Sequence, residues 1–293
     1  MSVTILDGGM GQELVSRSGA KPTGLWATQI MMDRPELVRQ IHDDYFAAGA
    51  EVATVNSYST QRDRLEPEGL GNLFENLQKT ACEIACRSRD AHGSGIVAGS
   101  LGPLGWSYSH DGAPSAERAA ELYDEICRVQ FDYVDVFLIE TIASLEQANG
   151  ALSGALGNGK PVWLGLTVDD HNGTCLRSGE QLQGIFGLIE EHPPQALILN
   201  CSVPEAISQG LGSIAGTGIQ IGAYANGFTE ISTEFLQKGS TVASLSSRTD
   251  LTPDAYADHA GHWIDLGAEI VGGCCEVGPA HIAELARRFG KRD

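Results

Sequence analysis

The sequence has few basic residues: 19 Lys and Arg stand against 38 Asp and Glu, which gives the 293-residue chain a formal net charge of −19. Partners rich in phosphate bind to surfaces of Lys and Arg, so we predict neither nucleic acid nor an anionic membrane as a partner. The sequence also has no apolar run of the roughly 20 residues that a membrane-spanning helix needs. Its first residues lack the basic stretch and long apolar segment of a secretory signal, so we expect a cytoplasmic protein.

The seven cysteines are an odd number in a large chain, which argues against a disulfide framework and favours metal or thiol chemistry. Three of them fall in helical patterns, where they are interpreted as small buried apolar residues, and a fourth lies in a Gly-rich turn without a predicted role. These four are Cys82, Cys86, Cys127 and Cys175. The other three, Cys201, Cys274 and Cys275, differ in position because they follow strand-like segments.

Short β-branched runs alternate with longer amphipathic segments along the whole chain, which is typical of βα units. The predicted strands cover residues 3–9, 52–56, 96–101, 136–141, 162–168, 196–202, 219–226 and 269–275. The predicted helices cover residues 35–48, 73–92, 116–133, 144–156, 180–190, 204–211, 253–266 and 279–289. Eight such units without a break in composition predict one α/β domain over residues 1–293, a (β/α)8 TIM barrel. Periodicity alone does not close a barrel, so an open doubly wound sheet is the alternative.

Two connections are longer than a minimal barrel loop, and both follow the ends of predicted strands. Residues 102–114 are rich in Gly, Ser and Pro and carry Trp106, Tyr108 and His110. Residues 227–250 are polar and without clear periodicity. Barrel active sites are built from loops at this end of the strands, so we expect both loops near the site, the second as a candidate lid.

Polar and reactive residues gather where the predicted strands end. The strand ends that carry them read Leu6-Asp7-Gly8-Gly9, Asn56-Ser57-Tyr58, Ile139-Glu140-Thr141, Asn200-Cys201-Ser202, Tyr224-Ala225-Asn226 and Gly272-Gly273-Cys274-Cys275. In a barrel these positions converge on one mouth although they are far apart in sequence. Burying Asp7 or Glu140 there is costly without a partner, and the amino group of a ligand would be suitable. A helix cap for Asp7 and a buried ion pair for Glu140 remain open.

Three thiols at the ends of neighbouring strands, from Cys201, Cys274 and Cys275, would then face one another. Thiolates bind Zn²⁺ well, and three protein ligands leave the fourth tetrahedral position open for substrate. A substrate thiol bound there is held as a thiolate, ready to attack a methyl group on a cationic donor. The glycines before the cysteine pair are expected to leave room for metal and substrate.

Other interpretations of these cysteines stay open. They could be buried packing, a redox pair with a vicinal Cys274–Cys275 disulfide, or a structural metal site. A structural Zn²⁺ normally has four protein ligands, and His110 is the residue of the mouth-side loops that could supply the fourth. A metal-free barrel lyase or isomerase is a further alternative, but it leaves the strand-end thiols unexplained.

At these residues the sequence resembles the homocysteine S-methyltransferase family, in particular its zinc-dependent single-domain members. The resemblance covers nearly the whole chain, and the Asn-Cys-Ser and Gly-Gly-Cys-Cys motifs are specific together. It implies that Cys201, Cys274 and Cys275 hold Zn²⁺, with the homocysteine sulfur as fourth ligand. It also implies a direct displacement in which the homocysteine thiolate takes the donor's methyl group and becomes methionine.

The resemblance also implies where homocysteine is held. Asp7 and Glu140 would bind its ammonium group, and the backbone amides of Gly8 and Gly9 would lie near its carboxylate. Asn226 matches a family position close to the site, although hydrogen bonding between strand ends accounts for it equally well.

The donor side is less determined by the resemblance. Ser57 and Tyr58 are assigned to it, with ordinary packing at the barrel mouth as the alternative. Ser59 stands where betaine-using relatives often have tyrosine, which argues against betaine. The chain also lacks the C-terminal extension of the betaine enzymes and the folate- and cobalamin-binding domains of modular methionine synthases. S-methylmethionine, S-adenosylmethionine, dimethylsulfoniopropionate and a methyl-carrying partner protein remain open as donors.

Two motifs depart from the family pattern. The cysteine pair is followed by Glu276-Val277-Gly278-Pro279 where relatives commonly have Gly-Thr-Thr-Pro, and Tyr224-Ala225-Asn226 replaces Tyr-Pro-Asn. The first change leaves a different acceptor thiol as an alternative to homocysteine. The oligomeric state is open as well, a homo-oligomer included.

Overall fold

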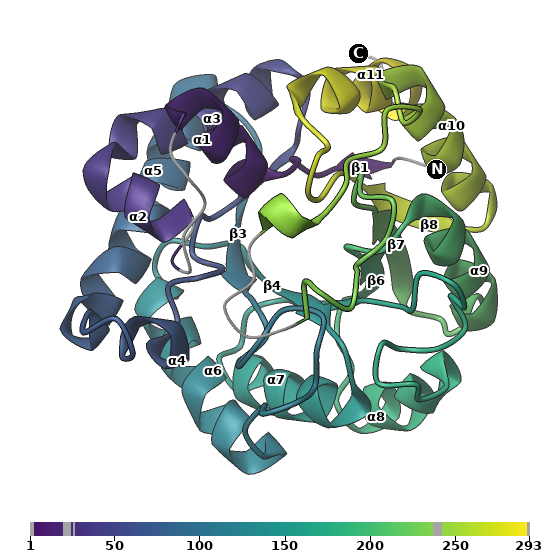
Figure 1. The fold of residues 1–293 in the computed structure, drawn as a ribbon, viewed down its shortest axis with the longest axis horizontal. Helices are drawn as coiled ribbons and strands as arrows, with labels where there is room; N and C mark the ends of the chain where they lie inside the picture. Colours follow the sequence, from purple (N-terminus) through teal and green to yellow (C-terminus); the bar gives the residue numbers. More distant parts are fainter. Residues whose placement is uncertain (1–2, 20–24, 26, 237–241, 292–293) are drawn as a thin grey trace.

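In the computed structural model, which describes residues 3–19, 25, 27–236 and 242–291, eight short strands form one parallel sheet at the centre of the protein (Figure 1). The strands are β1 (Thr4–Ile5), β2 (Val52–Thr54), β3 (Ile96–Leu101), β4 (Val136–Ile142), β5 (Val162–Leu166), β6 (Ala196–Asn200), β7 (Gln220–Tyr224) and β8 (Ala268–Val271).

The sheet closes into a barrel. Each strand pairs in parallel with the next along the chain from β2 to β8, and β1 pairs with β8 through Thr4 and Ile270. A parallel bridge between Leu6 and Val52 joins β1 to β2 and completes the ring. The prediction of a TIM barrel is therefore confirmed, and the alternative of an open doubly wound sheet is wrong.

The strands are buried on both faces because helices surround the ring, as expected for a parallel sheet. In β6, for example, Ala196 and Ile198 point into the barrel, whereas Leu197 and Leu199 pack toward the helices. This alternation follows from the two-residue period of a strand. It decides which residue at each strand end faces the barrel interior.

Helices ring the outside of the barrel (Figure 1). The α-helices are α1 (Met10–Ser18), α2 (Ala27–Asp33), α3 (Pro35–Ala47), α4 (Arg62–Leu65), α5 (Phe74–His92), α6 (Ala116–Gln130), α7 (Leu145–Leu156), α8 (Ile185–Glu191), α9 (Pro204–Ile214), α10 (Pro253–Asp265) and α11 (Pro279–Phe289). The 3₁₀ helices are η1 (Gly71–Leu73), η2 (Leu182–Gly184) and η3 (Val242–Ser244). Side-chain caps start several of them: Ser144 accepts a hydrogen bond from the Gln147 amide, and Ser115 accepts one from Arg118.

The predicted elements differ from the observed ones mainly at their ends. Helices α1, α2 and α4 were not predicted, and the predicted helix 180–190 begins only at Ile185, after the turn of η2. Several predicted strands extend too far: β1 ends at Ile5 and β8 at Val271, and the residues beyond are loops. The chain leaves the sheet there to form the rim of the barrel, where the polar residues lie.

The long segment after β7 packs over the barrel mouth. Phe228 and Ser247 form an antiparallel bridge, and η3 lies between them in sequence. Residues 237–241, in the predicted loop 227–250, lie outside the described residues. One apolar cluster, which we call the roof cluster, joins this segment to the mouth. Its buried members are Tyr108, Cys201, Phe228, Ile231, Phe235 and Val242.

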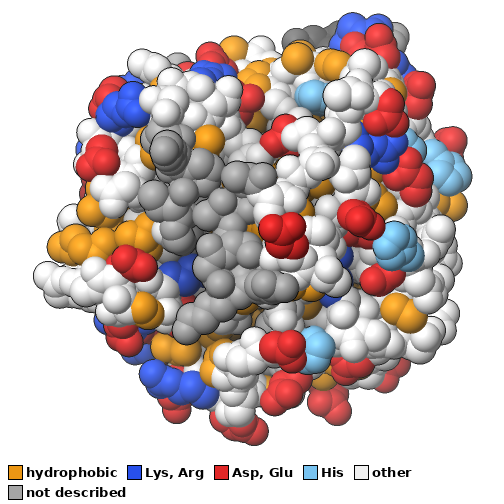
Figure 2. All heavy atoms as spheres, in the orientation of Figure 1, with side chains coloured by type: hydrophobic (Ala, Val, Ile, Leu, Met, Phe, Trp, Pro, Cys, Tyr) orange, Lys and Arg blue, Asp and Glu red, His pale blue; other side chains and the backbone are white. Residues whose placement is uncertain are grey.

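Charged side chains are spread over the surface. On the face shown in Figure 2, most Lys and Arg side chains lie toward the periphery, beside acidic ones. The expectation that nucleic acid does not bind stays a prediction. Within the described residues, every helix is too short or too polar to cross a membrane.

Candidate active site

The ends of seven strands bring polar residues to one cavity at the mouth of the barrel. Among the residues that line it are Asp7 after β1, Tyr58 after β2, Glu140 in β4 and Tyr224 in β7. All three strand-end cysteines line it as well, as do Gly8 and Gly9. No Lys, Arg or His is among the described residues that line this cavity, so its walls favour a cationic ligand.

The three strand-end cysteines form one cluster. The Sγ atoms of Cys201, Cys274 and Cys275 all lie within 4.8 Å of one another. A tetrahedral Zn²⁺ about 2.3 Å from each sulfur needs the sulfurs roughly 3.8 Å apart, so three thiolates at these strand ends are close enough to share one ion. The donor set therefore fits a zinc site with three protein ligands.

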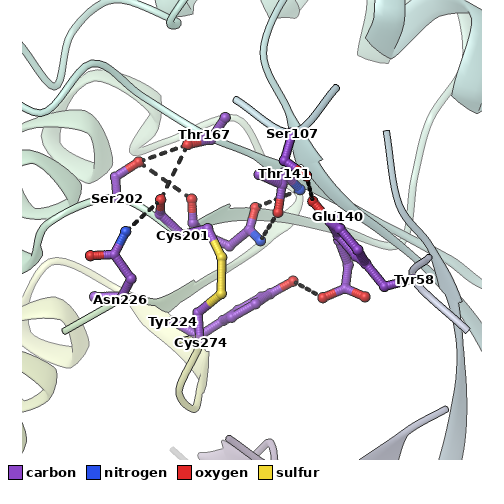
Figure 3. Close-up of a disulfide and its surroundings, with 12 residues drawn as sticks. Tyr58, Ser107, Glu140, Thr141, Thr167, Cys201, Ser202, Tyr224, Asn226 and Cys274 are labelled. Atoms are coloured by element: carbon purple, nitrogen blue, oxygen red, sulfur yellow. Dashed lines mark hydrogen bonds between the residues drawn. A yellow bond between two sulfur atoms is a disulfide. The ribbon is translucent and has the colours of Figure 1, made fainter. Parts of the chain in front are cut away.

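In the structure, two of these cysteines form a disulfide. Cys201 and Cys274, 73 residues apart in sequence, are bonded with their Cα atoms 5.6 Å apart (Figure 3). Cys275 keeps a free thiol, and burial raises its pKa to about 12. The alternative of a vicinal Cys274–Cys275 disulfide is therefore wrong. His110 does not join the cluster either, because its side chain is 48% exposed and pairs with Asp111.

Two carboxylates, of the buried Asp7 and the half-buried Glu140, face the same cavity. Asp7 accepts hydrogen bonds from the Thr54 amide and hydroxyl at 2.7 and 2.8 Å. Glu140 accepts them from the Ser100 hydroxyl at 2.5 Å and the Tyr224 hydroxyl at 3.2 Å (Figure 3). Burial raises the pKa of Asp7 to about 7, with a further contribution from the charge of Glu140, and burial raises the pKa of Glu140 to about 7. An ammonium group between them would favour the charged form of both.

The raised pKa values predict a pH dependence of stability. The ordinary pKa of Glu140, 4.5, is raised to about 7, so the ligand-free folded protein holds this proton more tightly than the unfolded chain. Protonation of Glu140 therefore stabilises the folded protein at a pH below its ordinary pKa. This stabilisation is lost as the pH rises through the pKa that Glu140 has in the folded protein. We therefore expect the unfolding free energy of wild type, relative to Glu140→Gln, to fall between about pH 5 and about pH 8 in urea titrations. A pH-independent difference between the two proteins would contradict this.

Four residues other than glycine have left-handed backbone conformations in the described chain, and all lie at this mouth. They are Tyr108, Thr141, Cys201 and Glu276, with φ of 64°, 60°, 53° and 65°. Such conformations cost about 1–3 kcal/mol each unless the surroundings fix them. For Thr141 the surroundings do so: Asn200 accepts from its amide at 3.0 Å and donates to its hydroxyl at 3.1 Å. The strain is concentrated where the site needs a fixed geometry.

Two of the residues assigned to the site lie behind the cavity wall. Asn226 is buried, donates to the carbonyl of Cys201 at 2.9 Å and accepts from the amide of Phe228, so it fixes the strand ends (Figure 3). Ser57 donates to the Ser100 carbonyl and accepts from Gln130, away from the cavity.

The position of Ser57 follows from the turn after β2. This strand ends at Thr54, and Val55, Asn56, Tyr58 and Ser59 beyond it line the cavity, whereas Ser57 turns away from it. Within β2, Val52 faces the barrel interior, and the two-residue alternation of a strand gives Thr54 the same face. The same rule would have found Thr54 as the partner of Asp7, which sequence reasoning missed along with Ser100 and Tyr224.

The glycines of the site allow protein segments to pack closely. A Cβ atom on Gly273 would lie 2.1 Å from a methyl carbon of Val277, and one on Gly9 would lie 2.6 Å from the Cys274 carbonyl oxygen. The expectation that the glycines before the cysteine pair make room for metal and substrate is corrected for Gly273, because protein atoms occupy that space.

The backbone amide of Gly9 is not free to bind the carboxylate of a substrate. Gly9 donates its N–H to the Val277 carbonyl at 2.9 Å, so this group is already used. Helix α1 begins directly after it, with no side-chain cap, and Met10 and Gly11 of its first turn line the cavity. The first N–H groups of a helix have no partner within the helix and attract anions. This turn suits a carboxylate better than Gly9 does.

Comparison with known proteins identifies the family. The family model described as homocysteine S-methyltransferase matches residues 4–289. The chain belongs to the homocysteine S-methyltransferase family. It is therefore a methyltransferase.

Individual relatives are similar to this chain over almost the full length of both proteins. The homocysteine S-methyltransferase of Escherichia coli K12 is 28% identical over 309 residues, covering 98% of this chain and 95% of its own. The solved structure of the homocysteine methyltransferase MmuM from Escherichia coli in its metallated form has a TM-score of 0.83 at 25% identity, covering 98% of this chain and 96% of that chain. Its oxidized form has a TM-score of 0.82, with the same identity and coverage.

Glu276, the residue after the cysteine pair, departs from the motif expected from the sequence. Glu276 accepts a hydrogen bond from Gln12, which lines the cavity. Its side chain is thus tied to α1, and the unusual residue leaves the cysteine cluster intact.

Proposed function

We propose that the protein transfers a methyl group from a small cationic donor to the thiol of homocysteine, using Zn²⁺ held by Cys201, Cys274 and Cys275. The observation that carries this proposal is one cavity that combines three clustered thiols with two carboxylates. The thiols suit a metal that binds a substrate sulfur, and the carboxylates suit the ammonium group of an amino acid. The family membership and the metallated relative support both assignments.

The residues around the cavity would bind and orient homocysteine. Asp7 and Glu140 hold its ammonium group, and Thr54, Ser100 and Tyr224 keep the two carboxylates in place. The carboxylate of homocysteine lies at the first turn of α1. These contacts at one end of the molecule direct its sulfur toward the cysteine cluster.

The cysteine cluster suits the reaction chemically. Bound Zn²⁺ would supply a positive charge that keeps the acceptor sulfur as a thiolate near neutral pH. The surrounding protein contributes by excluding water, since Cys201 is 4% exposed and Tyr108, Phe228 and Phe235 cover the cluster.

The reaction balances with a sulfonium donor. The thiolate sulfur of homocysteine forms the new bond to the methyl carbon, and the bond from that carbon to the donor sulfur breaks. The electron pair stays on the donor sulfur, which leaves as a neutral thioether, and the thiol proton has been lost to solvent. Tyr58 and Tyr108 line the cavity, and tyrosine rings attract cations, which supports a sulfonium donor such as S-methylmethionine or S-adenosylmethionine.

The proposed zinc site requires a reducing compartment. A Cys201–Cys274 disulfide removes two of the three proposed ligands, so the thiols must be kept reduced for zinc to bind. The cytoplasm provides such conditions.

Methionine formation tests the proposal directly. The reduced, zinc-loaded protein is incubated with homocysteine and, in separate reactions, with S-methylmethionine, S-adenosylmethionine, dimethylsulfoniopropionate and betaine. We expect methionine with at least one sulfonium donor and none with betaine. Bound zinc without methionine from any donor would contradict the proposed substrates, and absence of zinc binding would contradict the metal site.

A further inference from the structure

One ion pair beside the active site is almost completely buried. The side chains of Asp170 and Arg177 are 5% and 8% exposed, and the guanidinium donates to Asp170 Oδ1 at 2.8 Å. Asp170 also accepts from the amides of Val203 and Ile231 at 3.0 and 2.8 Å. The pair thereby joins the loops that follow β5, β6 and β7.

On one side, Arg177 is linked through Thr167 to the backbone of Cys201, one of the proposed zinc ligands. Its Nε donates to the Thr167 hydroxyl at 2.9 Å. This hydroxyl lies 3.0 Å from the Ser202 hydroxyl and 3.4 Å from the carbonyl oxygen of Cys201 (Figure 3). Cys201 has the left-handed conformation described above, so contacts with its carbonyl help to hold a strained peptide.

On the other side, Arg177 is linked to Cys275 through the ring of Tyr108. The guanidinium carbon lies 5.1 Å from the centre of the Tyr108 ring, within the range of a cation–π contact. Cys275 in turn packs against the roof cluster to which Tyr108 belongs. The same ring packs edge-on against Phe235 in the roof cluster.

From these contacts we propose that Arg177 is a positioning residue, which sets Cys201 and Cys275 at the separation that lets them share one Zn²⁺. The inference rests on the proposed function, because it assigns a role toward the proposed metal. A buried ion pair adds little stability compared with apolar residues of the same size, so stability alone does not explain it. Groups that hold metal ligands in place commonly contribute 10- to 100-fold to metal affinity.

Only a guanidinium makes all three contacts together. Its central carbon lies over the Tyr108 ring while two different N–H groups donate to Thr167 and Asp170. A lysine at this position keeps the charge that Asp170 requires, but a single ammonium lacks the planar face and the fixed fork of donors. Arg177→Lys therefore separates the positioning role from simple neutralisation of a buried carboxylate.

The experiment measures zinc affinity on reduced protein by competition with a chromogenic chelator, in wild type, Arg177→Lys, Tyr108→Leu and the double variant. Arg248→Lys is the matched control, since Arg248 also binds two carboxylates, Glu205 and Asp250, but at the surface. Circular dichroism and thermal unfolding of the metal-free proteins show whether each variant is folded. Alkylation of Cys275 in metal-free protein gives a second readout that does not depend on turnover.

We expect Arg177→Lys and Tyr108→Leu, which removes the ring, each to weaken zinc binding by about 10- to 100-fold, with less than additive loss in the double variant, and Arg248→Lys to match wild type. Cys275 should be alkylated faster in both single variants. Zinc affinity of folded Arg177→Lys within about 2-fold of wild type overturns the inference, whereas failure of wild type to bind zinc overturns the proposed function instead. If Arg177→Lys does not fold, wild-type zinc affinity in folded Tyr108→Leu overturns the inference in the same way.

Discussion

Replacing Cys275 by serine is expected to abolish methionine formation and to weaken zinc binding by more than the roughly 100-fold that outer contacts to a metal site contribute. Serine keeps the size of the side chain but offers a hydroxyl, which is a poor zinc ligand near neutral pH compared with a thiolate. Two thiolates would remain, and the substrate sulfur would face a metal with too few protein ligands. The measurements are zinc content after dialysis, chelator competition and methionine formation.

Cys175→Ser is the matched control for this variant. Cys175 is also a buried free cysteine, but it lies outside the cluster, where Asn172 and Gln181 donate to its sulfur. We expect its zinc content and turnover to equal those of wild type. Full zinc content in Cys275→Ser would show that this cysteine is not a zinc ligand. Normal turnover without zinc would show that the reaction does not need the metal.

Replacing Glu140 by glutamine is expected to raise the KM for homocysteine and to change kcat much less. The variant keeps the shape of the side chain but loses the negative charge that faces the substrate ammonium. A hydrogen bond to a charged group contributes about 1.5–3 kcal/mol, which corresponds to roughly a 10- to 100-fold increase in KM. Because the ammonium does not change during methyl transfer, the contact is made equally in the ground and transition states.

The control for Glu140→Gln is the same substitution at Glu146, an exposed residue in the first turn of α7. Steady-state kinetics with varied homocysteine at saturating donor separate KM from kcat. An unchanged KM in Glu140→Gln would show that this carboxylate does not bind the acceptor. A rise in the KM of the methyl donor instead would place Glu140 on the donor side.

The sequence predicted the barrel from its eight alternating strand and helix patterns, and the candidate site from the polar residues at the strand ends. Asp7, Glu140 and the cysteine pair could be placed together because all strands of a parallel barrel end at one rim. The prediction for Ser57 misplaced that residue because it lies in a turn beyond β2, where the pattern of the strand no longer fixes the direction of a side chain. Helix α1 was missed because it is short and follows Gly9, which offers no capping side chain.

Backbone conformation was beyond sequence reasoning. Glycine and asparagine are the residues expected at positive φ, so nothing in the sequence marks Cys201 or Thr141 as left-handed. These conformations arise only when the folded loops supply Asn200 and Asn226 as hydrogen-bond partners. The disulfide between Cys201 and Cys274 likewise depends on the approach of two strand ends across β7.

The seam between β1 and β8 has a consequence for the order of folding. The three thiols come from the last third of the chain, whereas Asp7 follows the first strand, which joins the ring through β8 and the Leu6–Val52 bridge. A nascent chain can gather the thiols once β8 is made, but the cavity exists only after the two ends of the polypeptide meet. Contacts between distant segments form slowly, so closure of this seam should be a late event. The appearance of substrate binding during refolding then reports ring closure, separately from the appearance of metal binding.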